Sequence, residues 1–216
     1  MDNNLIVVGI GASAGGITAV KAFLSALPDD PGMVFVVILH LMPDHESRLA
    51  EVLQAATRMP VTQVTEAVAV KANHVYVVPP DQSLSMIDGH LALSPRIRTE
   101  ERRAPIDIFF RTLGESHRTR AIGVVLSGTG ADGAIGLKRI KEHGGLCFAQ
   151  APADAEYSDM PRNAIATGVV DYVLPARDIP ARIHSLVEHL RRLPASPLTS
   201  WTAIRRVIRR RMVGRL

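Results

Sequence analysis

The sequence predicts an α/β fold built on a doubly wound, mainly parallel sheet flanked by helices. One observation is a series of strand-length apolar runs with almost no polar residues, as is typical of strands covered on both faces. A second is that these runs alternate with stretches whose apolar residues recur at helical spacing. The expected strands are residues 5–10, 33–39, 75–78, 121–126 and 171–174.

The stretches between these strands are expected to form helices. Pro43 and Asp44 supply a start signal for the second helix, and Gly144-Gly145 supply a stop signal for the fourth. The expected helices cover about residues 15–27, 46–56, 106–118, 132–143 and 178–192.

Residues 79–98 interrupt this alternation and predict a β-hairpin excursion at the edge of the sheet. Pro79-Pro80-Asp81 is typical of a turn, and residues 84–93 resemble two short strands that turn at Asp88-Gly89. Residues 194–200 (PASPLTS) resemble a linker. We therefore expect one large domain over residues 1–192, followed by a linker and a basic amphipathic helix over residues 193–216.

Composition narrows the class of protein. The chain has 216 residues, of which 47% are hydrophobic, so it can bury a substantial core. No apolar run approaches the ~20 residues of a membrane-spanning helix, and the N-terminus lacks the features of a secretory signal. A single cysteine, Cys147, excludes an internal disulfide and fits a reducing compartment. We expect a cytoplasmic protein, with Cys147 as a small buried hydrophobe.

The net charge of +4 comes mainly from the C-terminal end. Without that end the chain is close to neutral, which argues against nucleic acid as a partner of the core. Six arginines lie in the last sixteen residues: Arg205, Arg206, Arg209, Arg210, Arg211 and Arg215.

The first expected strand ends in a glycine-rich turn, residues 11–16 (GASAGG), with Ser13 at its centre. This is the G-x-S-x-G pattern of a nucleophile elbow, in which a serine stands exposed on a sharp strand-to-helix turn. A rival pattern overlaps it: Gly9, Gly11 and Ala14 match G-x-G-x-x-A, the phosphate-binding turn of dinucleotide-binding folds. Either pattern alone is weak.

Three polar residues of complementary chemistry follow three expected strands: Ser13, His40 and Asp132. The carboxyl ends of parallel strands share one edge of a sheet, so these residues are expected to converge there. A histidine can take the proton of a serine at neutral pH, and a carboxylate can orient the imidazole. The structural alternatives are a turn serine, a strand-end histidine and an aspartate that caps a helix.

Cofactor and metal sites are less well supported. A dinucleotide site calls for an acidic residue at the end of the second strand, where His40 and Leu41 stand instead. His40, Asp44 and His45 lack a further ligand cluster for a metal, and no lysine follows the glycines as in a P-loop. We expect neither a metal nor a cofactor, with dinucleotide binding as the minor alternative.

The motifs together resemble the catalytic domain of the CheB family of chemotaxis protein-glutamate methylesterases. The similarity extends over about residues 4–192. The segments that carry it are residues 11–16 (GASAGG), 40–43 (HLMP), 76–80 (YVVPP), 126–134 (LSGTGADGA) and 160–164 (MPRNA).

This resemblance implies hydrolysis of glutamate γ-methyl esters on the cytoplasmic helices of chemoreceptors, and some members also deamidate receptor glutamines. It implies Ser13 as nucleophile, His40 as general base and Asp132 as the residue that orients His40. It also implies an oxyanion hole formed by the backbone amides of Ala14 and Thr129, the latter in place of a methionine common in the family. A non-catalytic binding or scaffold domain of the same fold is the alternative.

Two departures from the family accompany the resemblance. Its usual receiver domain is expected to be absent, because this sequence starts at the catalytic strand, as in a stand-alone relative or a piece of a methyltransferase-fused variant. The family's His-Arg-Pro-x-Val-Asp segment corresponds here to residues 102–107 (RRAPID), with Arg102 in place of histidine.

The C-terminal end combines an apolar stripe with arginines. Trp201, Ile204, Ile208 and Met212 recur at three or four positions, which is typical of an amphipathic helix. Two interpretations stay open: a solvated helix or the start of a further domain, or a weak electrostatic contact with an acidic protein or lipid surface.

Overall fold

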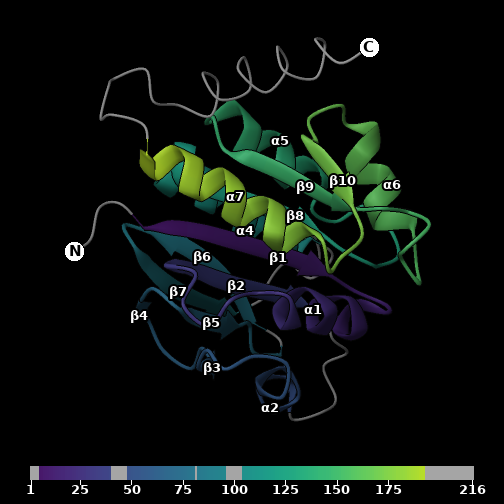
Figure 1. Cartoon of the computed structure of the whole chain (residues 1–216). Helices are drawn as coiled ribbons and strands as arrows, with labels where there is room; N and C mark the ends of the chain where they lie inside the picture. Colours follow the sequence, from purple (N-terminus) through teal and green to yellow (C-terminus); the bar gives the residue numbers. More distant parts are fainter. Residues whose placement is uncertain (1–4, 40–47, 81, 96–103, 193–216) are drawn as a thin grey trace.

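The computed structural model describes residues 5–39, 48–80, 82–95 and 104–192 (Figure 1). The expected linker and C-terminal helix, residues 193–216, lie outside these ranges, as does His40. Across the described ranges, no helix has both the length and the apolar character needed to cross a bilayer.

A parallel sheet runs through the middle of the molecule. In the described part of the chain it has seven strands in the order β10-β9-β8-β1-β2-β5-β3. The central strand β1 (Ile6–Ala12) pairs in parallel with β2 (Met33–Leu39) on one side and with β8 (Ala121–Val125) on the other. The outer strands are β3 (Val61–Gln63), β5 (His74–Val77), β9 (Leu146–Gln150) and β10 (Tyr172–Leu174). The predicted parallel α/β fold is confirmed.

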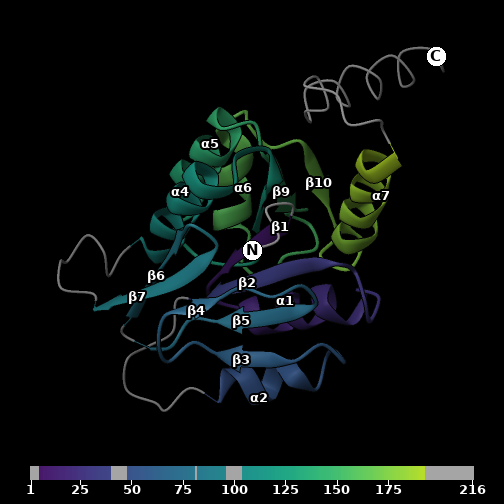
Figure 2. The same cartoon turned by 90° about the vertical axis from the view of Figure 1, so that its left-hand side faces the viewer.

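Alternating side chains along the strands build a separate core on each face of the sheet. On β1, Val8 and Ile10 belong to one core and Val7 to the other. Helices of the first core and helices of the second lie on opposite sides of the sheet (Figure 2). The first are α1 (Gly16–Ser25), α2 (Leu49–Gln54) and α7 (Ile179–Arg192), and the second are α4 (Pro105–His117), α5 (Ala134–Glu142) and α6 (Asp159–Ala166).

Strand β9 and helix α6 are absent from the sequence-based expectations. The β9 segment follows directly after the Gly144-Gly145 stop signal, contains Cys147 and ends in the polar Gln150. In sequence it therefore resembles part of a loop. Helix α6 has only eight residues and carries Pro161 near its start. Both elements are short, and their packing against the second core stabilises them more than their own pattern does.

The predicted hairpin exists, but it does not extend the main sheet. Strands β6 (Gln82–Ile87) and β7 (His90–Pro95) join at Asp88-Gly89, where both residues have positive φ. In the described residues they form a three-stranded sheet with β4 (Val68–Ala69). Leu84, Met86 and Leu91 turn inward to the second core. The Met86 N–H donates to Thr112 Oγ1 of α4 at 3.0 Å, so the hairpin supports α4.

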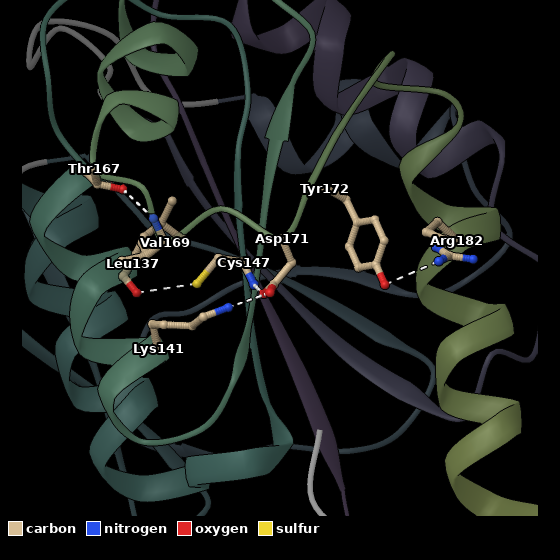
Figure 3. Close-up of polar contacts among 8 residues, drawn as sticks. All are labelled: Leu137, Lys141, Cys147, Thr167, Val169, Asp171, Tyr172 and Arg182. Carbon is tan, nitrogen blue, oxygen red and sulfur yellow. Dashed lines mark hydrogen bonds and ion pairs between the residues drawn. The ribbon is translucent and has the colours of Figure 1, made fainter. Parts of the chain in front are cut away.

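The edge strand β10 is fixed by side chains from both faces (Figure 3). Asp171 pairs with Lys141 of α5 and accepts the Cys147 N–H at 3.0 Å. On the other face, the Arg182 guanidinium of α7 lies 4.5 Å from the centre of the Tyr172 ring and donates to its hydroxyl at 3.2 Å. Cys147 is fully buried, as expected.

Close contact between α4 and β1 leaves room only for glycine at position 11. A Cβ there would collide with Cγ2 of Ile106 and approach its Cδ1 at 3.1 Å. We expect Gly11→Ala to lower the free energy of unfolding by about 1–3 kcal/mol through overpacking, measured by chemical denaturation. The double variant Gly11→Ala/Ile106→Ala should lose less free energy of unfolding than the two single variants lose together, because the alanine at position 106 makes room for the new Cβ at position 11. Additive losses would contradict this account.

Candidate active site

Ser13 lies in the turn between β1 and α1. The strand ends at Ala12, Gly15 takes a left-handed conformation with φ 67°, and α1 begins at Gly16. The Ser13 carbonyl accepts the Gly16 N–H at 2.8 Å, which closes the turn. This is the strand–turn–helix context that a nucleophile elbow needs, and Ser13 is only partly buried in it.

The loop that follows β8, residues 126–133, packs directly against this elbow. The Ser13 N–H donates to the Ser127 carbonyl at 3.0 Å. A Cβ on Gly128 would lie 2.9 Å from Cβ of Ser13 and would collide with Sδ of Met160. The two motifs, more than a hundred residues apart in the sequence, therefore meet at the carboxyl ends of adjacent parallel strands, as predicted.

Asp132, in the same loop, caps a helix other than the one it precedes. Its Oδ2 accepts the Ile106 N–H at 3.1 Å, and its Oδ1 accepts the Asp107 N–H at 2.9 Å. Both amides belong to the first turn of α4, whose own N-cap residue, Ala104, has no side-chain cap. The capping interpretation of Asp132 is thus correct, but for α4 and not for α5.

Asp107 returns the same interaction to α5. Its carboxylate accepts the Gly136 N–H at 2.6 Å and further amide bonds from Gly133 and Ile135. Gly133 is the N-cap residue of α5, with φ 93°, and has no side chain with which to cap the helix. We call these two interactions the reciprocal caps. They fix the two helix starts, and with them Asp132, relative to each other.

The reciprocal caps bring two carboxyl groups together in a poorly hydrated place. Burial raises the pKa of Asp132 to about 7, and the nearby Asp107 adds to this rise, while hydrogen bonds from the two α4 amides and from the Gly133 amide oppose it. Burial also raises the pKa of Asp107, against the opposing α5 amides. The Ile106, Asp107 and Gly133 amides use three of roughly four acceptor positions of the Asp132 carboxylate, so one further donor can still bind.

The two predicted oxyanion donors are the backbone amides of Ala14, in the elbow, and Thr129, in the loop that packs against it. In the ranges described, neither the Ala14 nor the Thr129 N–H donates to a protein acceptor. The loop around Thr129 is held from α6 and the segment before it. The Gly128 N–H donates to the Tyr157 carbonyl at 3.0 Å, and Asn163 Nδ2 donates to the Gly130 carbonyl at 2.7 Å.

The third predicted site residue, His40, lies outside the described residues. Leu39, the last residue of β2, pairs with Ala12, so β2 ends beside the strand that leads to Ser13. The structure therefore brings the turn that carries Ser13 and Ala14 against the loop that carries Thr129 and Asp132, and the assembly of these residues with His40 into one site stays a prediction. Arg102 also lies outside the described residues.

Comparison with known proteins identifies the family. The family model of the CheB methylesterase matches residues 8–183. The chain belongs to the CheB methylesterase family. In structure it resembles the crystal structure of the Thermotoga maritima CheB methylesterase catalytic domain, with a TM-score of 0.76 and 29% identity over 85% of this chain and 99% of that one.

Individual relatives agree with this assignment. A Leptospira interrogans protein is 37% identical over 177 residues, 82% of this chain and 92% of its own. This protein and a Vibrio vulnificus protein share the double name protein-glutamate methylesterase/protein-glutamine glutaminase, which is provisional for the Leptospira protein. The Vibrio protein is 34% identical over 181 residues, which make up 81% of this chain and 52% of the Vibrio protein. Membership makes this chain a carboxylic ester hydrolase and favours the nucleophile elbow over the dinucleotide pattern.

The raised pKa of Asp132 predicts a pH-dependent stability. Between the unfolded value of 3.8 and about 7, the folded chain holds a proton that the unfolded chain has lost, so the free energy of unfolding falls as pH rises. We expect Asp132→Asn to remove a decline of the order of a few kcal/mol across this window. Chemical denaturation at pH 4.5 and 7.5 measures it, with Asp159→Asn, exposed on α6, as the control for a lost charge. The same pH slope in wild type and Asp132→Asn would contradict the prediction.

Proposed function

We propose that Ser13, His40 and Asp132 form a catalytic triad that hydrolyses glutamate γ-methyl esters on the cytoplasmic helices of chemoreceptors. The observation that supports this most is the packing of the Ser13 elbow against the loop that carries Asp132 and Thr129. Family membership supports the reaction class, and the names of the relatives support protein glutamate as the substrate. Such a substrate implies a cytoplasmic enzyme.

In the first half of the reaction, Ser13 Oγ attacks the ester carbonyl while His40 takes the hydroxyl proton. Charge develops on the carbonyl oxygen, where the N–H groups of Ala14 and Thr129 stabilise it. The tetrahedral intermediate collapses, and His40 returns the proton to the departing methoxide, which leaves as methanol. Ser13 then carries the glutamyl side chain as an acyl ester.

In the second half, His40 takes a proton from water, whose oxygen attacks the acyl ester. Ser13 regains its proton, and the product is a free glutamate carboxylate. The same steps with ammonia as the leaving group convert glutamine to glutamate. The double name of the relatives supports this second activity.

Asp132 acts in this scheme as an ionised acceptor that orients His40. Burial raises the pKa of its carboxyl to about 7, so its charged form depends on a cationic partner. An imidazolium at His40, which forms in each half-reaction, supplies that charge. The two groups therefore support each other's charged forms at the moment when charge separation is greatest.

The first test is removal of the nucleophile. We expect Ser13→Ala to abolish methanol release from a methylated receptor fragment and to leave the melting temperature within a few degrees of wild type, because Ser13 is held by backbone contacts. Ser25→Ala, at the exposed end of α1, should retain full activity. Methanol release by Ser13→Ala at the wild-type rate would refute the nucleophile assignment.

The second test addresses the orienting carboxylate. By analogy with a protease triad, Asp132→Asn should lower kcat by on the order of 10⁴-fold. Asp159→Asn serves again as the matched control. Unchanged turnover in Asp132→Asn would leave Asp132 with its capping role alone.

A non-catalytic scaffold domain is the competing function. Labelling of Ser13 by a fluorophosphonate discriminates the two, because the reagent needs an activated serine. Wild type should be labelled and Ser13→Ala should not. Absence of labelling and of methanol release in wild type would favour the scaffold.

For the chain as a whole, residues 1–192 are proposed as the catalytic domain and residues 193–216 as a linker with a basic amphipathic helix. The arginine-rich end would add a weak electrostatic attraction to acidic receptor or lipid surfaces. A salt titration of binding to receptor fragments and anionic vesicles, with and without residues 201–216, tests it. Equal binding of both forms would eliminate this role.

A further inference from the structure

Ser127 is a buried polar residue that the triad does not use. It follows Leu126 at the end of β8 and is only 1% exposed. A hydroxyl buried to this extent needs partners, since leaving it without hydrogen bonds is costly. Its partners lie on both sides of the nucleophile.

Ser127 contacts the elbow through two different atoms. Its carbonyl accepts the Ser13 N–H at 3.0 Å, and its Oγ donates to the Ala14 carbonyl at 2.9 Å. The same Oγ accepts the Tyr157 N–H at 3.0 Å, so the hydroxyl both donates and accepts. Packing leaves little freedom here, because a Cβ on Gly15 would come within 2.8 Å of this oxygen.

These contacts fix the three peptide groups around Ser13. The 12–13 peptide is held by the Ser127 carbonyl, the 13–14 peptide by the Gly16 N–H, and the 14–15 peptide by Ser127 Oγ. The Ala14 N–H belongs to the middle group and points opposite to the Ser13 carbonyl, because a peptide is planar and trans. It is thus aimed by bonds on both sides.

A buried side-chain amide in turn holds Ser127. The Ser127 N–H donates to Gln150 Oε1 at 2.8 Å, and Gln150 is 2% exposed. Gln150 Nε2 donates to the Asp154 carboxylate at 2.8 Å, which also accepts the Ala176 N–H at 2.9 Å. The Ser127 backbone is therefore anchored by the strand ends of β9 and β10 and not by the elbow alone.

We propose that Ser127 is a positioning residue for the oxyanion hole: its hydroxyl fixes the 14–15 peptide and so aims the Ala14 N–H at the developing oxyanion. The inference rests on the proposed esterase function. Without the hydroxyl, the Ala14 carbonyl and the Tyr157 N–H lose their partner, and the peptide chain beside Ser13 can rotate. Donors of an oxyanion hole act through preorganisation, so a loosened donor costs turnover more than substrate binding.

The kinetic test compares three variants in the methanol-release assay. We expect Ser127→Ala to lower kcat by on the order of 10- to 100-fold, as for a small misplacement of a catalytic group, with KM within about threefold of wild type. Ser127→Thr keeps the hydroxyl and should recover most of kcat. Ser83→Ala removes an equally buried hydroxyl from β6 and should leave kcat unchanged.

A second measurement needs no substrate, so it separates failure of this inference from failure of the proposed function. In ¹⁵N-resolved NMR spectra, the Ala14 and Gly15 amide signals should shift or broaden in Ser127→Ala and stay near their wild-type positions in Ser127→Thr and Ser83→Ala. Wild type without ester turnover would overturn the proposed function. Unchanged amide signals or unchanged kcat in Ser127→Ala, or equal loss in Ser127→Ala and Ser127→Thr, would overturn the positioning role.

Discussion

The contact between the end of β1 and the loop after β8 is the constraint on which the site depends. Parallel pairing places Gly11 beside Val125, so the two chains leave the sheet side by side. The glycine at position 128 then lets the loop approach Ser13 to a distance that no side chain would permit. The proposed nucleophile and the loop that carries the proposed orienting carboxylate are thus joined by backbone packing, which is stiffer than contact between long side chains.

The reciprocal caps between α4 and α5 are a second constraint, and they stabilise two partly buried carboxylates, those of Asp132 and Asp107. Neither helix has a side-chain cap from its own N-cap residue; α4 is capped by Asp132, from the loop before α5, and α5 by Asp107 of α4. Amide donors and the positive end of each helix stabilise these carboxylates, but only in part, since burial still raises the pKa of both. The site therefore holds Asp132 in a fixed place while leaving its charge sensitive to a neighbour, which suits a group that must respond to a forming imidazolium.

Patterns in the sequence predicted what depends on local order. Apolar runs were sufficient to predict the central strands, and the glycine-rich patterns at their ends were sufficient to predict that the Ser13 turn and the loop of residues 126–133 lie at one edge of the sheet. Short elements such as β9 and α6 escaped because tertiary packing decides them. The roles of Asp107 and Ser127 escaped for another reason: they act on backbone groups 29 and 113 residues away, and such contacts leave no periodic trace.

The observed capping role of Asp132 and its proposed catalytic role are compatible. Two α4 amides hold its carboxylate in a single orientation, so an imidazole that donates to it meets a preorganised acceptor and not a rotating side chain. The proposed role of Ser127 is similar: its hydroxyl holds the Ala14 carbonyl, and the group to be positioned is the Ala14 N–H. In both places a side chain from one sheet-end loop binds backbone groups of another segment. In the proposed site, backbone groups that secondary structure already holds therefore position both the Asp132 carboxylate and the Ala14 N–H.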